Sequence, residues 1–185
     1  FKVIFSGNIG KAQNLDNFLK AVKLIQNYKN NIKWIFVGDG SQKKWLIEKI
    51  NLLKLKDKFK FYNHRPSHMI PKLYEKVDAG LISLKGGLTF NNTLPAKFQS
   101  YIAFGLPVFT FASGETFRIT KKFKVGFSCN PNNVSEFVDK VIEFSKFSEK
   151  KIKKIKKNNQ DIYKKNFSKK KAIFIIVSEI ERLIK

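Results

Sequence analysis

The sequence predicts an α/β fold: a Rossmann-like, doubly wound parallel sheet of about six strands with helices on both faces. Two observations carry this prediction. Short apolar runs alternate along the chain with longer segments of helical periodicity, and Gly or Asn marks the connections between them. The short runs are apolar almost throughout rather than at every second position, which is typical of strands that helices cover on both faces.

The first strand and helix follow from residues 2–28. Residues 2–7 are apolar and β-branched, and Gly7-Asn8-Ile9-Gly10 ends the run. Asn14 stands where it would cap a helix that reaches about Tyr28. The side chains expected on the buried face of this helix are Leu15, Phe18, Leu19, Val22 and Ile25.

The remaining elements repeat this alternation. Further strands are expected at residues 32–37, 59–62, 79–84, 107–111 and 125–128. Further helices are expected at residues 41–53, 67–76, 94–104, 134–147, 149–165 and 169–184. Gly38-Asp39-Gly40 ends the second strand, and Gly105 ends the helix that precedes the fifth. Ligands of such sheets bind at the carboxyl ends of the strands, so the loops there are where a site is expected.

Length and composition fit one globular domain. The chain has 185 residues, 43% of them hydrophobic, including 19 Phe. No apolar run approaches the roughly 20 residues of a membrane span, and no signal peptide is recognisable. Cys129 is the only cysteine, which fits a reducing cytoplasm. The chain opens inside a strand without Met, so we expect a fragment whose preceding residues are missing.

The formal net charge of +23 has two explanations. Such a charge is typical of proteins that bind nucleic acid or an anionic membrane. However, Lys, Asn, Ile and Phe are all frequent, as an AT-rich genome would produce, and Lys then fills positions that need only be polar. Residues 146–171 carry twelve Lys against Glu149 and Asp161. Their apolar residues recur at helical spacing, which indicates either packing on the domain or attraction to an anionic membrane.

Four ordered stretches of the chain resemble the C-terminal domain of glycosyltransferase family 4. They are Phe5–Gln13, with Gly followed by Lys, then Val37-Gly38-Asp39-Gly40, then residues 69–81, and finally residues 93–108. The last stretch, with its Pro-x-Lys and Tyr-x-Ala-x-Gly-x-Pro pattern, is similar to the branch that makes amino-sugar linkages in O-antigens and capsules. The resemblance implies the C-terminal half of a GT-B fold and covers about residues 1–130.

The resemblance also implies what the chain does. It implies a retaining hexosyltransferase, with a nucleotide sugar as substrate rather than cofactor, and it favours UDP as the nucleotide. Many members have two glutamates that contact the donor, and Asn92 and Ser100 stand at those positions here. Asn and Ser offer neutral hydrogen bonds, which are weaker than charge-assisted ones.

A departing diphosphate can be stabilised by a metal, or by a Lys or Arg together with helix N-terminal amides. The sequence has no convincing metal-ligand cluster, so metal-free stabilisation is expected. Lys11 is the leading phosphate-binding candidate, because Gly7, Asn8 and Gly10 before it let the backbone approach a ligand. Lys97 is the second, because a cation in the first turn of a helix opposes the helix dipole. Both lysines could equally be ordinary surface residues.

Other candidates surround the expected diphosphate. The amides near Thr93 and Leu94 would complete an anion cradle. Arg65 could contact a phosphate, or stack on the base together with Tyr62. Glu115 could bind the hydroxyls of the donor sugar, or cap a helix. His64 and His68 are interpreted as loop and cap residues, because Pro66 separates them and no third metal ligand is evident.

We therefore expect residues 1–147 to form a Rossmann-like donor-binding domain. Residues 148–185 would be basic helices that pack on it or return toward a missing N-terminal GT-B domain. The expected acceptor is a lipid-linked or polysaccharide glycan of bacterial surface synthesis, and the expected location is cytoplasmic, with peripheral membrane contact. Two alternatives stay open: a GT-B type UDP-sugar epimerase, and a non-catalytic module that binds nucleic acid or a membrane surface. A nucleic-acid partner is not expected, because the Phe residues fall in core positions.

Overall fold

The structure is a computed structural model that describes residues 1–28, 31–87 and 91–184. Its centre is a parallel sheet of six strands in the order β3-β2-β1-β4-β5-β6. The strands are β1 (Lys2–Ser6), β2 (Lys33–Val37), β3 (Phe59–Tyr62), β4 (Ala79–Ser83), β5 (Val108–Phe111) and β6 (Gly126–Cys129). The predicted α/β fold with six parallel strands is thereby confirmed.

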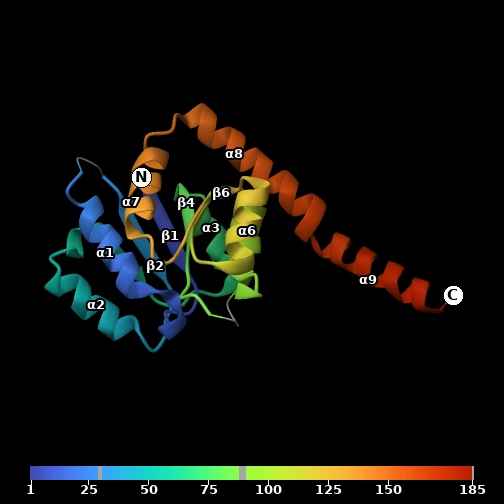
Figure 1. Cartoon of the computed structure of the whole chain (residues 1–185), viewed down its shortest axis with the longest axis horizontal. Coiled ribbons are helices and arrows are strands. Elements are labelled where there is room, and N and C mark those ends of the chain that lie inside the picture. The colour runs from blue at the N-terminus through green and yellow to red at the C-terminus, as the bar shows by residue number, and fades with distance from the viewer. Residues whose placement is uncertain (29–30, 88–90, 185) are drawn as a thin grey trace.

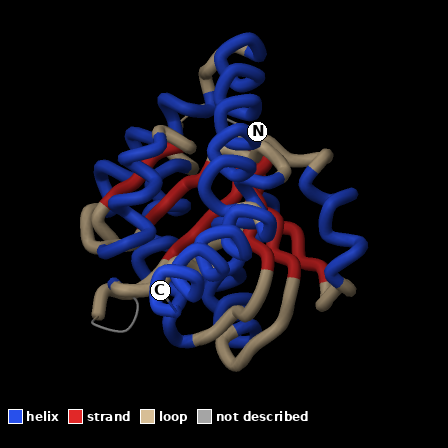
Figure 2. The backbone as a smooth tube through the Cα atoms, turned by 90° about the vertical axis from the view of Figure 1, so that its right-hand side faces the viewer, coloured by secondary structure: helices blue, strands red, loops and turns tan. Residues whose placement is uncertain are grey.

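Helices cover both faces of this sheet (Figures 1 and 2). The helices of the described residues are α1 (Leu15–Ile25), α2 (Lys43–Leu52), α3 (Ile70–Tyr74), α5 (Ala96–Ala103), α6 (Gly114–Phe123), α7 (Val134–Ser145), α8 (Glu149–Ile162) and α9 (Lys169–Ile184), of which α9 does not cover the sheet. Short 3-10 turns lie at Lys11–Gln13, Lys56–Lys58 and Ser67–Met69, and a π-helical turn at Tyr163–Phe167 follows α8. Alternating strand residues separate two cores, with Phe5 in one and Ile4 in the other.

Each core joins one face of the sheet to its own helices. The first contains buried residues of α1, α2 and α7, such as Phe18, Leu46 and Phe137. The second contains residues of α3 and α5, such as Tyr74 and Phe98. Apolar burial of this kind is the main stabilising contribution to the fold, at about 25 cal/mol per Å².

The start of α1 differs from the prediction. Asn14 precedes the helix, but its side chain makes no capping bond, and its backbone is left-handed with φ of 44°. The Asn14 side chain instead donates a 2.8 Å hydrogen bond to the carbonyl of Pro131. The residue therefore ties the start of α1 to the loop after β6.

Helix α6 is absent from the sequence prediction. Its buried residues are Thr116 and Thr120, so the apolar periodicity that reveals a helix is missing. The buried hydroxyls are satisfied locally. Thr120 Oγ1 lies 2.8 Å from Thr110 Oγ1 of β5 and donates to the carbonyl of Thr116 at 2.7 Å. Hydrogen-bonded threonines thus take the most buried positions of α6, beside the partly buried Ile119 and Phe123.

Helices α8 and α9 differ in how they contact the domain. Asn159 of α8 is fully buried, and its Nδ2 donates to the carbonyls of Leu106 and Val125 at 2.8 and 2.9 Å. Helix α8 is thus fastened to the domain, whereas α9 projects away from it (Figure 1). Ile173, Phe174 and Leu183 of α9 are all exposed. A search of the described residues finds no helix with the length and apolar character needed to cross a membrane.

Candidate functional site

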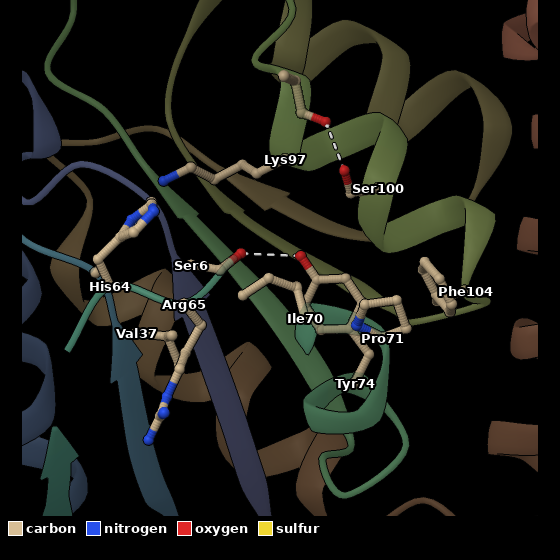
Figure 3. Close-up of a pocket in the computed structure, with 13 residues that line it drawn as sticks. Ser6, Val37, His64, Arg65, Ile70, Pro71, Tyr74, Lys97, Ser100 and Phe104 are labelled. Atoms are coloured by element: carbon tan, nitrogen blue, oxygen red, sulfur yellow. Dashed lines mark hydrogen bonds between the residues drawn. The ribbon is translucent and has the colours of Figure 1, made fainter. Parts of the chain in front are cut away.

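A cavity of about 500 Å³ opens at the carboxyl ends of β1 and β2. Its lining residues come from the loops after β1, β2 and β3 and from α3 and α5 (Figure 3): Ser6, Gly7, Val37, Gly38, His64, Arg65, Ile70, Pro71, Tyr74, Ala96, Lys97, Ser100 and Phe104. In the strand order, β1 lies between β2 and β4, so the connections on its two sides run in opposite directions. Such a switch point is where doubly wound sheets bind ligands.

Two glycines allow the loops after β1 and β2 to meet beside this cavity. Gly7 and Gly38 have φ of 120° and 143°, a backbone region that side chains disfavour. Gly7 N donates to the carbonyl of Val37 at 2.9 Å. A Cβ at Gly38 would lie only 2.1 Å from the carbonyl oxygen of Gly7. A side chain at Gly38 would therefore force the two loops apart.

Three hydroxyl groups fix the end of β1 to the helices around the cavity. Ser6 N donates to the hydroxyl of Tyr101 at 3.0 Å, and that hydroxyl donates to the carbonyl of Ile4 at 3.2 Å. Ser6 Oγ and the Tyr74 hydroxyl lie 2.9 Å apart (Figure 3). Burial raises the pKa of Tyr101 and of Tyr74 above their ordinary values. Both phenols therefore stay protonated, and neither brings negative charge to the cavity.

Lys97 is the charged group best placed to act in the cavity. It lies in the first turn of α5, and its side chain extends toward the loop that carries His64 (Figure 3). The side chain is only partly buried overall, but Nζ is shielded from solvent and has no hydrogen-bond partner among the described residues. Nζ lies 3.6 Å from the centroid of the Phe5 ring. Desolvation lowers the pKa of Lys97 from 10.5 to about 7.

The rim of the cavity is polar on one side and apolar on the other. His64 and Arg65 are exposed, and Arg65 points away from Lys97 (Figure 3). Ser100 donates its hydroxyl proton to the Ala96 carbonyl at 3.2 Å, within the same helix. The opposite side is formed by Ile70, Pro71 and Phe104. The cavity thus combines a buried amine, the exposed side chains of His64 and Arg65, and an apolar wall.

The structure brings some of the predicted residues together and leaves others outside. Those that line the cavity are Gly7, Arg65, Lys97 and Ser100. Those outside the lining are Asn8, Gly10, Lys11, Tyr62, Asn92, Thr93, Leu94 and Glu115. Lys11 is exposed on the short turn before α1. Tyr62 is partly buried, with the Lys60 amine 5.2 Å from its ring centroid.

The predicted residues near Thr93 and Glu115 lie beside the start of α6. Ser113 Oγ donates to Asn91 Oδ1 at 2.6 Å, and Thr116 Oγ1 donates to the Thr93 carbonyl at 3.3 Å. Glu115 forms an ion pair with Arg118, 2.6 Å away in the first turn of this helix. Glu115 thus pairs with a residue of its own helix, and its role in sugar binding stays a prediction.

The lining residues Ser6 and Tyr74 had no predicted role, and neither had Tyr101, whose hydroxyl bonds to Ser6. Their hydrogen bonds join residues 68 and 95 positions apart, which no local pattern indicates. The available signal was the position of Ser6 at the end of a buried strand. Among the described residues, no three His, Cys, Asp or Glu side chains are grouped so that they could hold a metal ion.

Comparison with known proteins identifies the family. The family model described as "Glycosyl transferases group 1" matches residues 1–162. The chain belongs to the group 1 glycosyltransferases. A curated relative of Pseudomonas aeruginosa, described as "Probable glycosyltransferase WbjE", is 25% identical to this group 1 chain over 147 residues. The match covers 75% of the chain but only 35% of the relative, so the chain spans about a third of that protein's length.

Solved structures agree with this assignment at the level of the fold. The HepE protein of Anabaena, in complex with UDP and glucose, matches the group 1 chain with a TM-score of 0.77 and 21% identity. The match covers 100% of this chain and 48% of HepE. The C-terminal domain of the group 1 protein LpcC from Francisella tularensis matches with a TM-score of 0.71 and 20% identity, over 91% of this chain and 87% of that domain.

Proposed function

We propose that this chain is the donor-binding half of a glycosyltransferase that uses a UDP-sugar, with a hexose or an N-acetylamino sugar as the transferred group. The observation that carries the proposal is the buried, unpartnered amine of Lys97 beside Gly7 in the cavity. A buried cation is costly unless an anion pairs with it, and a diphosphate at this position would supply that anion. The UDP bound to HepE supports a uridine nucleotide.

The chemistry requires a group that stabilises the departing diphosphate. In the transfer, the bond between the anomeric carbon and a diphosphate oxygen breaks. The acceptor oxygen bonds to that carbon and loses its proton to solvent, while negative charge develops on the diphosphate. Protonated Lys97 would offset this charge in a site of low dielectric, where such contacts are strongest. We therefore propose a metal-independent reaction, with Lys11 as a second phosphate contact. That the reaction is retaining is proposed from the resemblance to the family alone.

The remaining lining suits the rest of the donor. The flat apolar wall of Ile70, Pro71 and Phe104 fits a nucleobase, and Arg65 at the rim fits a phosphate or the face of that base. Ser100 would bind a ribose hydroxyl. Asn92, Thr93 and Glu115 stay candidates for contacts with the sugar.

The partners of the domain are proposed from its remaining surface. Residues 1–147 would bind the donor, and residues 148–185 would connect this domain to the half that binds a lipid-linked or polysaccharide acceptor. A role in bacterial surface-glycan synthesis, on the cytoplasmic side, fits the similarity of residues 93–108 to the amino-sugar branch. The lysines of residues 146–171, nearly all exposed, would favour peripheral contact with anionic lipid.

Thermal unfolding in the presence of nucleotides tests the donor proposal. UDP should raise the Tm of the 185-residue chain more than GDP, ADP or TDP, because ligands that bind the folded state stabilise it. Lys97→Met should lose most of that increase, measured against its own unliganded Tm. Lys72→Met, at an exposed position of α3 outside the cavity, should keep it. An unchanged Tm with every nucleotide, or an equal increase in Lys97→Met, would contradict the proposal.

A further inference from the structure

The amine of Lys97 has no negative group that would keep it charged in the empty cavity. Nζ lies 3.6 Å from the centroid of the apolar Phe5 ring. It also lies 3.7 Å from the position that a Cβ on Gly7 would occupy, which is an ordinary van der Waals contact. The residues described along the cavity include no Asp or Glu. A buried amine in such surroundings avoids an uncompensated charge by releasing its proton.

The other titratable groups around the cavity do not change this balance. From α3 and α5 come the phenols of Tyr74 and Tyr101, which burial keeps protonated and neutral. From the loop after β3 come His64 and Arg65, both exposed and both cationic when charged. A neighbouring cation disfavours a charge on Lys97 rather than supporting it. Apart from the face of the Phe5 ring, only a bound anion would favour the protonated amine.

We propose that a nucleoside diphosphate enters this cavity together with one proton, which the neutral amine of Lys97 accepts from solvent on its lone pair. This inference rests on the proposed donor site and adds that the Lys97 amine is neutral before the ligand binds. The diphosphate then meets an ammonium group within a shielded cavity, where a charge-assisted hydrogen bond is strong. The flexible four-carbon stem of lysine allows Nζ to leave the Phe5 ring and reach the ligand.

Proton uptake sets the pH dependence of binding. Free Lys97 has a pKa of about 7, and the bound anion raises it. At pH values between the pKa of the unliganded amine and that of the complex, binding of one UDP takes up nearly one proton. The Kd for UDP should therefore rise by up to about tenfold for each pH unit in that range. Well below pH 7 the amine is protonated before the ligand arrives, and the dependence should vanish.

Calorimetry of UDP binding in two buffers measures the uptake directly. Titrations at about pH 8 are made in HEPES and in Tris, whose ionisation enthalpies differ, and the terminal phosphate of UDP, with a pKa near 6, is already ionised there. The difference in heat should correspond to more than half a proton taken up per UDP. Lys97→Met should bind more weakly and with little uptake. Lys72→Met, at an exposed position outside the cavity, should keep the uptake.

The outcomes separate this inference from the proposed function. No binding heat in either buffer would contradict both. Binding with equal heats in the two buffers would overturn the proton uptake alone, as would full uptake in Lys97→Met. If Lys97→Met binds too weakly to measure, NMR of the lysine Cε resonances in the original chain decides. The resonance that is absent from Lys97→Met should titrate near pH 7 without UDP and at clearly higher pH with it, and identical titrations would overturn the inference.

Discussion

At the scale of single residues, the buried amine of Lys97 destabilises the unliganded fold, and a bound anion would offset that destabilisation. Its amine is shielded and unpartnered among the described residues, and its pKa is lowered to about 7. Because each tenfold change in proton affinity corresponds to about 1.4 kcal/mol, the charged amine weakens the folded state by a few kcal/mol. A residue kept at such a cost is a candidate for function rather than packing.

Replacing Lys97 by Met should therefore stabilise the unliganded chain, and by less as the pH rises. Between about pH 7 and 10 the unfolded lysine holds its proton and the folded one has released it, so the stability of the original chain rises with pH. Lys97→Met should raise the free energy of unfolding by about 1–3 kcal/mol near pH 7, because the cost of burying the charged amine disappears. This increase should shrink toward pH 10. Urea unfolding at several pH values measures it. A gain that does not change with pH, or that Lys72→Met reproduces, would contradict the buried charge.

Tyr101 is the second residue whose replacement has a specific outcome. Tyr101→Phe removes the acceptor of the Ser6 N–H and should cost about 1–3 kcal/mol, since a buried donor is left unsatisfied. Urea unfolding checks the loss. Tyr163→Phe is the matched control, because Tyr163 packs against the same core and its hydroxyl has no recorded bond within the described ranges. Equal losses in both variants would show that the Tyr101 hydroxyl does not stabilise the end of β1.

The sequence located part of the site at this scale and not the rest. Lys97 could be predicted because a cation in the first turn of a helix opposes the dipole, and Gly7 because glycine ends a buried strand. Lys11 was ranked above Lys97 on the glycines before it, but the structure leaves it exposed outside the cavity lining. The Ser6, Tyr74 and Tyr101 cluster depends on how distant segments pack, which one sequence without relatives does not reveal.

At the scale of elements, local periodicity determined most of the fold. The six strands were predicted because their apolar runs are short and bounded by glycine, asparagine or proline. Helix α6 was missed because its fully buried positions are Thr116 and Thr120, while its apolar residues Ile119 and Phe123 are only partly buried. Thr120 Oγ1 bonds to the Thr116 carbonyl and to Thr110 of β5. In β4, Gly80 leaves room for the Tyr101 ring, whose Cδ2 would lie 2.4 Å from an added Cβ.

Asn159 makes the buried polar contacts that attach α8 to the domain. Asn159→Asp keeps the shape of the side chain but removes both donated hydrogen bonds and sets a carboxylate against the carbonyls of Leu106 and Val125. An uncompensated buried charge should cost about 3 kcal/mol or more, which urea unfolding would detect. Asn166→Asp, on the exposed π-helical turn, makes the same chemical change and should cost far less. Similar losses at the two positions would mean that α8 is not fastened through Asn159.

At the scale of the whole molecule, charge and apolar surface gather at the C-terminal end. Most of the lysines of residues 146–171 are exposed, and α9 presents exposed apolar side chains including Phe174, Ile176 and Ile180. An anionic membrane would attract this end of the chain, and helix amphipathicity would favour its insertion at the interface. The alternative explanation of this surface is protein packing, in which another part of a longer protein would cover it.

Sedimentation with liposomes tests the membrane contact. The chain should bind vesicles that contain anionic lipid, less at high salt, and weakly to neutral vesicles, because surface attraction of this kind is screened by ions. Replacing Lys169, Lys170 and Lys171 by Gln should reduce binding severalfold, whereas replacing Lys20 and Lys23 of α1 should not. Binding that ignores lipid charge and salt would contradict the proposal.

The central claim is that the cavity at the carboxyl ends of β1 and β2 holds a nucleoside diphosphate. A crystal structure of the chain with UDP tests it most directly. The account predicts a diphosphate oxygen within hydrogen-bond distance of Lys97 Nζ, about 2.7–3.2 Å, and the base against Ile70 and Pro71. UDP bound elsewhere, for example in the groove between α1 and α2 beside Trp45, with the Lys97 amine still over Phe5, would contradict it.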